Sequence, residues 1–361
     1  MINTICSWYQ RNFTDPQAVF LTFFLVLGFA VILILGEMLT PVFAAVVIAY
    51  LLESAVKILN RFGLKRRNAA MLIFSLFLTL LFFIVFGIIP FFLNQVTEFF
   101  AEVPKYIGKG QQALLTIHQT LPFITPSQVE VFASKINSEM ANLGQRILTL
   151  SLASIPGLVS ALIYLVLVPL LVFFFMKDKS LILNWFSNYL SHQRGLAHEV
   201  WEELDMQLGN YIRGKFWEFL LLGLATFICF KIFHLRYSVF LALIVGFSVI
   251  FPYVGFVIVT IPVILISYYQ FDISSQFYFL MTGYFIINVL DGYILVPLLF
   301  SGVTNIHPIA IIVSLLLFGG LWGFWGVVFA IPLATLVNAI LHAWPRTAIC
   351  EPTISDMSIT G

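Results

Sequence analysis

Charged residues are scarce in this chain and absent from its longest apolar stretch. Asp, Glu, Lys and Arg make up 10% of the 361 residues, against about 25% in ordinary soluble domains. Residues 292–345 contain none of them over 54 consecutive positions. Because a helix needs roughly 20 apolar residues to cross a bilayer core, this stretch excludes a water-soluble fold. It predicts an integral membrane protein.

The chain also lacks a strong net charge and a cysteine framework. Its formal net charge is +1, whereas nucleic-acid binding requires a concentrated basic surface. The three cysteines, Cys6, Cys229 and Cys350, lie far apart and have no metal-ligand spacing. We therefore expect structural cysteines, no bound metal and no nucleic-acid partner. No small-residue cleavage site follows the first apolar run, so we expect that run to stay in the protein.

Catalytic and nucleotide-binding signatures are missing as well. The sequence GNYIRGK at residues 209–215 has the spacing of a phosphate-binding loop, but Phe216 replaces the Ser or Thr that would hold magnesium. His198 and Glu199 lack the second histidine of a zinc protease, and Asp291 lacks the second buried aspartate of an aspartyl intramembrane protease. No serine nucleophile elbow is present. The sequence thus predicts a protein that is not an enzyme and has no cofactor.

Charge-free windows predict an all-α polytopic membrane protein of about eight transmembrane segments, including broken or re-entrant helical hairpins. The predicted segments are residues 16–36, 40–59, 68–97, 147–176, 213–233, 237–271, 273–297 and 307–344. We expect Glu37 and Pro41 to end the first of them. We also expect breaks at FPYVG, residues 251–255, and at GGLWGFWG, residues 319–326.

Two regions between these segments carry mixed charges. Residues 93–150 have the apolar spacing of amphipathic helices punctuated by proline, which predicts a small extramembrane domain. Residues 177–212 mix aromatic and charged residues, a pattern typical of cytoplasmic interfacial helices, although an ordinary solvated helix fits equally. The remaining predicted parts are N-terminal transmembrane helices at 1–92, one transmembrane helix at 151–176, a C-terminal core with two broken hairpins at 213–345, and a cytoplasmic tail at 346–361.

Basic residues predict the orientation in the membrane. Positively charged short loops resist translocation. If the amino terminus is cytoplasmic, segments on that side hold twelve of the eighteen Lys and Arg residues. We therefore expect both termini in the cytoplasm and the 93–150 domain on the opposite side.

Polar residues within apolar helices are the best candidates for function, because they are costly in lipid and usually face a cavity, a partner or a pathway. Asp291 and Asn288 are three positions apart and so share a helix face, with Pro297 six positions on. The alternative is structural: Asp291 caps a helix or pairs with a basic side chain. His307, before Pro308, is either functional, since a histidine can exchange a proton, or simply structural. Secondary candidates are Glu53, Gln207, Asn210, Arg213 and Glu218; for Arg213 and Lys215, snorkelling to the interface fits equally.

The two predicted breaks have a mechanical interpretation. Interrupted helices leave peptide groups unpaired, which lipid tolerates only where they are buried in protein or line a watery cavity. Half-helices that meet at mid-membrane are how secondary transporters build binding sites. The alternative is close helix packing, since Gly319 and Gly323 fit a small-residue interface.

The segment DGYILVPLLFSGVTNIHPIAIIVSLLLFGGLWGFWGVVFAIPLATL, residues 291–336, resembles the signature region of the autoinducer-2 exporter family, and especially its bacterial permease branch. The FPYVG turn, the 207–214 stretch ending in YIRG and the early segment PVFAAVVIAYLLE are similar in order and spacing. The resemblance covers nearly the whole chain, and the succession HP, GG, G, G, IP is its most specific part.

This resemblance implies a multi-pass, inner-membrane, homo-oligomeric secondary transporter of a small molecule or ion, surrounded by lipid. Some members look like exporters of autoinducer-2 and others like sodium-proton antiporters, and a non-transporting membrane scaffold is a third possibility. We expect the two broken segments and the Asp291 helix to enclose the solute path. By motif position, the resemblance places function at Pro252, Gly255, Asp291, Pro297, His307, Pro308, Gly319, Gly320, Gly323, Gly326 and Pro332.

Overall fold

The computed structural model describes residues 16–118, 155–189, 195–252, 254–300 and 307–343, with a few positions between 131 and 142. Its described residues are helical and contain no strand, which confirms the predicted all-α membrane fold. Cys6, Cys350, the 346–361 tail and most of residues 119–150 lie outside them. The chain forms two compact units, residues 41–182 with 209–304, and residues 1–40 with 183–208 and 305–361. Each unit is described by itself.

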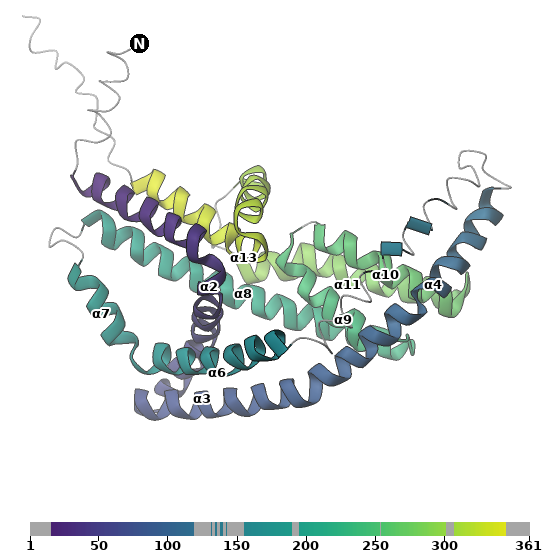
Figure 1. The fold of residues 1–361 in the computed structure, drawn as a ribbon, viewed down its shortest axis with the longest axis horizontal. Helices are drawn as coiled ribbons and strands as arrows, with labels where there is room; N and C mark the ends of the chain where they lie inside the picture. Colours follow the sequence, from purple (N-terminus) through teal and green to yellow (C-terminus); the bar gives the residue numbers. More distant parts are fainter. Residues whose placement is uncertain are drawn as a thin grey trace, which may run out of the picture. The chain divides into compact units, whose positions relative to one another are not determined.

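The helices follow one another along the chain as labelled in Figure 1. They are α2 (Pro16–Arg61), α3 (Arg66–Phe83), the π-helix η1 (Ile84–Ile88), α4 (Ile89–His118), α6 (Ile155–Lys177), α7 (Lys179–Tyr189), α8 (Gly195–Ile232), α9 (Ser238–Phe247), the 3-10 turn η2 (Ser248–Ile250), α10 (Val254–Phe271), α11 (Ser275–Leu290), the π-helix η3 (Asp291–Leu295), α12 (Val296–Phe300) and α13 (Pro308–Ala343).

Among the described residues, five helices are long and apolar enough to span a bilayer, and six if the bent pair α6 and α7 counts as one. Two of the predicted segments, 16–36 and 40–59, form a single helix, α2, of 46 residues. The expected end at Glu37 and Pro41 is therefore wrong. Pro41 has no N–H and cannot donate a backbone hydrogen bond. Next to it, Thr40 Oγ1 donates to the Gly36 carbonyl at 3.2 Å.

The third predicted segment is also longer than expected. Figure 1 shows α3, η1 and α4 as one continuous rod, Arg66 to His118. Its apolar part, Arg66–Tyr106, has 41 residues, or about 60 Å at 1.5 Å per residue, twice the bilayer core. No loop separates residues 68–97 from the predicted extramembrane domain, and Pro104 lies inside α4. Where the helix leaves the membrane stays a prediction.

Two π-helices interrupt long spans just before a proline. η1 ends at Ile88, two residues before Pro90, and η3 ends at Leu295, two residues before Pro297. A proline ring in a helix clashes with the carbonyl four residues earlier. The wider π turn relieves that clash without breaking the helix. Neither π-helix was expected from the sequence.

The unit of residues 41–182 and 209–304 contains two apolar cores. In the first, α4 packs on α8 through α11, with Phe99, Leu241 and Tyr284 among its buried residues. In the second, α2, α3 and α6 meet at small side chains such as Ala45 and Ala69. Figure 1 shows α6 running alongside α3. Large apolar residues elsewhere on these helices are exposed, as lipid-facing surfaces require.

The middle of α4 is fastened to the start of α9 by the Glu102 carboxylate. Glu102 Oε2 accepts hydrogen bonds from the Tyr106 hydroxyl at 2.6 Å and from the Tyr237 hydroxyl at 2.9 Å. Arg236 Nη1 donates to the same oxygen at 3.1 Å. Together these contacts hold α4 against the core that carries the first break.

Both predicted breaks are confirmed. In the FPYVG segment, α9 tightens into η2 and ends at Phe251 with φ −106° and ψ 85°, before α10 begins at Val254. In the other unit, α13 has a non-helical residue at Gly323, with φ 58° and ψ −135°, a conformation that favours glycine. A Cβ on Gly326 would lie 1.9 Å from the Phe318 carbonyl oxygen. The two halves of α13 therefore touch across a bend at Gly323.

Candidate transport site

A buried ion pair lies beside the FPYVG break. Lys215 Nζ lies 2.8 Å from Glu218 Oε2 on the same face of α8. The side chains are 18% and 5% exposed, respectively. Two charges at i and i+3 on an otherwise apolar helix are costly to bury unless they are paired and hydrogen-bonded.

The ammonium group of Lys215 also compensates for the break. Lys215 Nζ donates to the Val249 carbonyl at 2.8 Å, in the 3-10 turn where α9 stops. Carbonyls at a helix end have no partner within the helix, and lipid supplies none. Lys215 therefore joins α8 directly to the interrupted segment. Snorkelling, one interpretation of this lysine, does not describe its position.

Gly255 allows the segment after the break to return close to the turn before it. A Cβ at Gly255 would lie 2.1 Å from the Ser248 carbonyl oxygen. Gly255 N donates to the Phe251 carbonyl at 2.8 Å, and Val254 N to that of Pro252 at 2.7 Å. Pro252 and Gly255 thus form the corner itself.

An aromatic side chain from α12 completes this region. The Phe300 ring centroid lies 5.2 Å from Lys215 Nζ, within range for a cation–π interaction. The same ring lies against Gly214, where a Cβ would approach it to 2.6 Å. The Tyr211 ring packs against the Phe300 ring, with the two ring centroids 6.2 Å apart. The end of the Asp291 helix is therefore anchored to α8.

Asp291 is the first residue of η3, and its Oδ1 atom is buried without a hydrogen-bond partner among the described residues. Its carboxylate interacts electrostatically with Glu218 and Lys215. The structural alternative was that Asp291 forms a simple ion pair with a basic side chain. In the structure, the nearby Lys215 is paired with Glu218 instead. We call Lys215, Glu218, Asp291 and the Val249 carbonyl the charged cluster.

Comparison with known proteins agrees with the membrane fold and with the sequence motifs. The family model described as "AI-2E family transporter" matches residues 22–346. The chain belongs to the AI-2E family of transporters. It is 42% identical over 352 residues to "Putative permease PerM" of Escherichia coli K12, covering 97% of this chain and all of the relative.

More distant AI-2E relatives cover most of the chain too. "Putative transport protein YueF" of Bacillus subtilis is 27% identical over 319 residues, 85% of this chain and 84% of the relative. A "Putative transport protein" of Thermotoga maritima is 22% identical over 347 residues, 94% and 97% of the two chains. The expected family is therefore confirmed, and the chain is a multi-pass membrane protein.

Not every predicted site residue of this AI-2E transporter joins the charged cluster. Asn288 Nδ2 donates to the Tyr284 carbonyl of its own helix at 2.8 Å. The Tyr284 hydroxyl lies 3.0 Å from Thr260 Oγ1 on α10. Asn288 therefore has a partner within α11, and its predicted role beside Asp291 stays a prediction.

Two secondary candidates have structural partners. Arg213 donates to Asn210 Oδ1 at 2.7 Å and to Ser54 Oγ on α2 at 3.3 Å. Glu53, 7% exposed, lies 3.2 Å from Arg66 and 3.9 Å from Lys179. These contacts hold α2, α3, α7 and α8 together near their charged ends.

The other predicted residues belong to the second unit. His307 Nδ1 accepts a hydrogen bond from Ile309 N at 3.3 Å and so caps α13, with Pro308 as its first residue. Gly320 and Gly323 have open space where a Cβ would stand, whereas Gly319 faces Val327 at 2.9 Å. Pro332 is buried within α13, and Gln207 is half-buried in α8.

Glu218 was among the secondary candidates that the sequence indicated, whereas Lys215 was not. Their spacing, opposite charges three positions apart in an apolar helix, was the signal available. It was read as the charged end of a span, since only the fold brings Val249 and Asp291 to the same place. Within the ranges that the structure covers, no three His, Cys, Asp or Glu side chains come close enough to hold a metal ion.

Proposed function

We propose that this protein is an inner-membrane secondary transporter that exports a small solute, driven by an ion gradient. It acts as a homo-oligomer with both termini in the cytoplasm, and it uses neither ATP nor a cofactor. Membership in the AI-2E family and the permease and transport names of its relatives support this proposal.

The charged cluster beside an interrupted helix is the observation that carries the proposal. Charges in transmembrane segments are rare and mark ion or solute pathways by default. Here the Lys215–Glu218 pair completes an interrupted helix end, and Asp291 lies within electrostatic range of both charges in the same unit. A packing role alone would be served better by apolar residues, which often replace buried ion pairs without loss of stability.

In the proposed mechanism, Asp291 binds the coupling ion or a proton. Its unpartnered oxygen is available as an ion ligand, and neutralising it changes the field at Lys215 and Glu218. Lys215 then divides its hydrogen bonds differently between Glu218 and the Val249 carbonyl. Because Val249 lies in the last turn before the break, ion binding is coupled to the position of α9 relative to α10.

The test uses purified protein in proteoliposomes, with autoinducer-2 as the solute and an imposed proton or sodium gradient. We expect gradient-driven transport by the wild type and at least a tenfold loss in Asp291→Asn. The matched control is Glu98→Gln, which neutralises an exposed acid on α4. Wild-type rates in Asp291→Asn would reject the assigned pathway, and equal losses in both variants would point to a general effect of charge.

A sodium-proton antiporter is the second candidate, favoured by the two acidic side chains, Glu218 and Asp291, that share the cluster. Carboxylate oxygens bind protons and hard cations in competition. In proteoliposomes with an internal pH dye and no organic solute, sodium addition should then dissipate a proton gradient. An unchanged gradient, together with autoinducer-2 transport, would exclude this candidate.

A further inference from the structure

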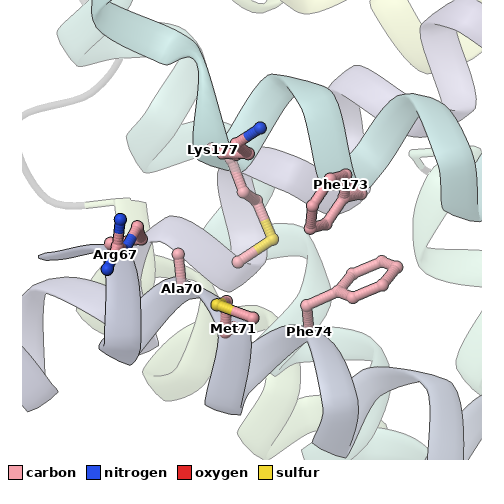
Figure 2. Close-up of a pocket in the computed structure, with 7 residues that line it drawn as sticks. Arg67, Ala70, Met71, Phe74, Phe173 and Lys177 are labelled. Atoms are coloured by element: carbon pink, nitrogen blue, oxygen red, sulfur yellow. The ribbon is translucent and has the colours of Figure 1, made fainter.

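A cavity of about 230 Å³ lies between α3 and α6. None of the residues that line it belongs to the charged cluster. Its walls are apolar: Figure 2 shows Ala70, Met71 and Phe74 from α3 facing Phe173 from α6. The rings of Phe74 and Phe173 have centroids 5.1 Å apart. Two basic side chains, Arg67 and Lys177, also line the cavity.

Neither of these cations has a carboxylate partner among the residues that the structure describes. The Lys177 ammonium lies 5.6 Å from the Phe173 ring centroid, and both basic residues are exposed. The neighbouring cations Arg66 and Lys179 instead share the buried carboxylate of Glu53. Glu53 is thus paired with Arg66 and Lys179, and Arg67 and Lys177 remain as the two basic side chains that line the cavity.

The cavity lies where apolar helices end. The apolar span of α3 begins at Arg66, and that of α6 ends at Lys177, where the chain bends by 79° into Lys179–Trp185. Helix ends of this kind lie at headgroup depth. The first turn of α3 has no acidic residue, and its N-cap, Lys65, makes no side-chain cap bond. Such a helix start favours a nearby anion.

We propose that this cavity binds an anionic phospholipid of the surrounding membrane. The lipid phosphate lies between the Arg67 guanidinium and the Lys177 ammonium, and an acyl chain covers the exposed Met71 and the two phenylalanine rings. Basic pockets between transmembrane helices recognise anionic headgroups through charge, and Arg presents a fork that matches phosphate oxygens. The apolar walls favour a ligand with a hydrocarbon chain over a free phosphate.

The experiment uses the full-length protein in neutral detergent, titrated with phosphatidylglycerol or phosphatidylcholine and followed by native mass spectrometry. We expect phosphatidylglycerol to bind tightly and the double variant Arg67→Gln/Lys177→Gln to bind it about 30-fold more weakly. The matched control is Lys57→Gln/Arg61→Gln, which also removes one Lys and one Arg, both exposed and outside the cavity.

A second variant tests the apolar part. Ala70→Phe should fill the cavity, leave both charges in place and still weaken phosphatidylglycerol binding. Circular dichroism and thermal unfolding verify that each variant is folded. Equal losses in the cavity and control variants, no loss in the cavity variant, or equal binding of phosphatidylcholine would overturn the proposal. Displacement by millimolar glycerol phosphate would also overturn it, because the site would then be one for a free phosphate ester.

Discussion

Lys215 on α8 donates a hydrogen bond to the Val249 carbonyl at 2.8 Å, so a charged side chain from one helix completes the interrupted end of another. The same ammonium group pairs with Glu218. The break at FPYVG is therefore stabilised by a specific contact that depends on charge. It is not an isolated loop in lipid.

The first prediction concerns this contact. Lys215→Met leaves Glu218 buried without its partner, which should destabilise the protein by about 3–5 kcal/mol. The double variant Lys215→Met/Glu218→Met should recover most of that loss, because no lone charge remains. Thermal or chemical unfolding in detergent measures both. Lys57→Met, at an exposed position on α2, should have little effect; a single variant as stable as this control would contradict the pairing.

The second prediction concerns Gly255. In Gly255→Ala the new methyl group would meet the backbone carbonyl of Ser248 at 2.1 Å, and backbone atoms cannot rotate away. We expect a loss of about 1–3 kcal/mol in unfolding free energy. Gly292→Ala is the matched control, since nothing lies within 4 Å of a Cβ there. Its stability should equal or exceed that of the wild type.

The third prediction concerns Glu102. Glu102→Gln removes a carboxylate that accepts from Tyr106, Tyr237 and Arg236. Hydrogen bonds to a charged group contribute more than neutral ones, so we expect a loss of about 1–3 kcal/mol. Hydrogen exchange should show faster opening of α4 around Glu102. Glu98→Gln on the same helix should leave exchange unchanged; equal protection in both variants would show that the carboxylate is not needed.

The fourth prediction compares the two π-helices. Pro297→Ala and Pro90→Ala each remove the ring that the π turn accommodates, so neither should lower the thermal midpoint. Only η3 begins at Asp291. Relaxation of η3 to an α-helix should shift Asp291 and reduce transport severalfold, whereas Pro90→Ala should transport normally. Equal transport by the two variants would mean that the π turn at Asp291 serves packing alone.

Several features of the fold could be predicted from single residues and their spacing. The breaks at FPYVG and at Gly323 follow from glycine and proline in apolar runs, because these residues are the ones that weaken a helix. The ends of helices were harder. Pro41 and Pro104 lie inside helices, since lipid gives an open peptide group no water to bond and so favours a continued helix.

The site could be predicted only in part. Asp291 stands out in any reading of the sequence, being the last charge before 54 uncharged residues. Glu218 was only one of several secondary candidates, and Lys215 was not a candidate, because charged residues near the start of a span are common and usually reach the interface. Their importance depends on Val249, more than thirty positions later.

By itself, the sequence determined the environment of this protein, its helical class, its breaks and its family, because these depend on composition and local spacing. Tertiary structure alone decided which charge meets which helix end. Burying an unpaired charge or carbonyl costs free energy, and only the contacts of α8 with η2 and α12 show which groups satisfy one another. Asp291 Oδ1 is left over from that pairing, and it is where we place the ion.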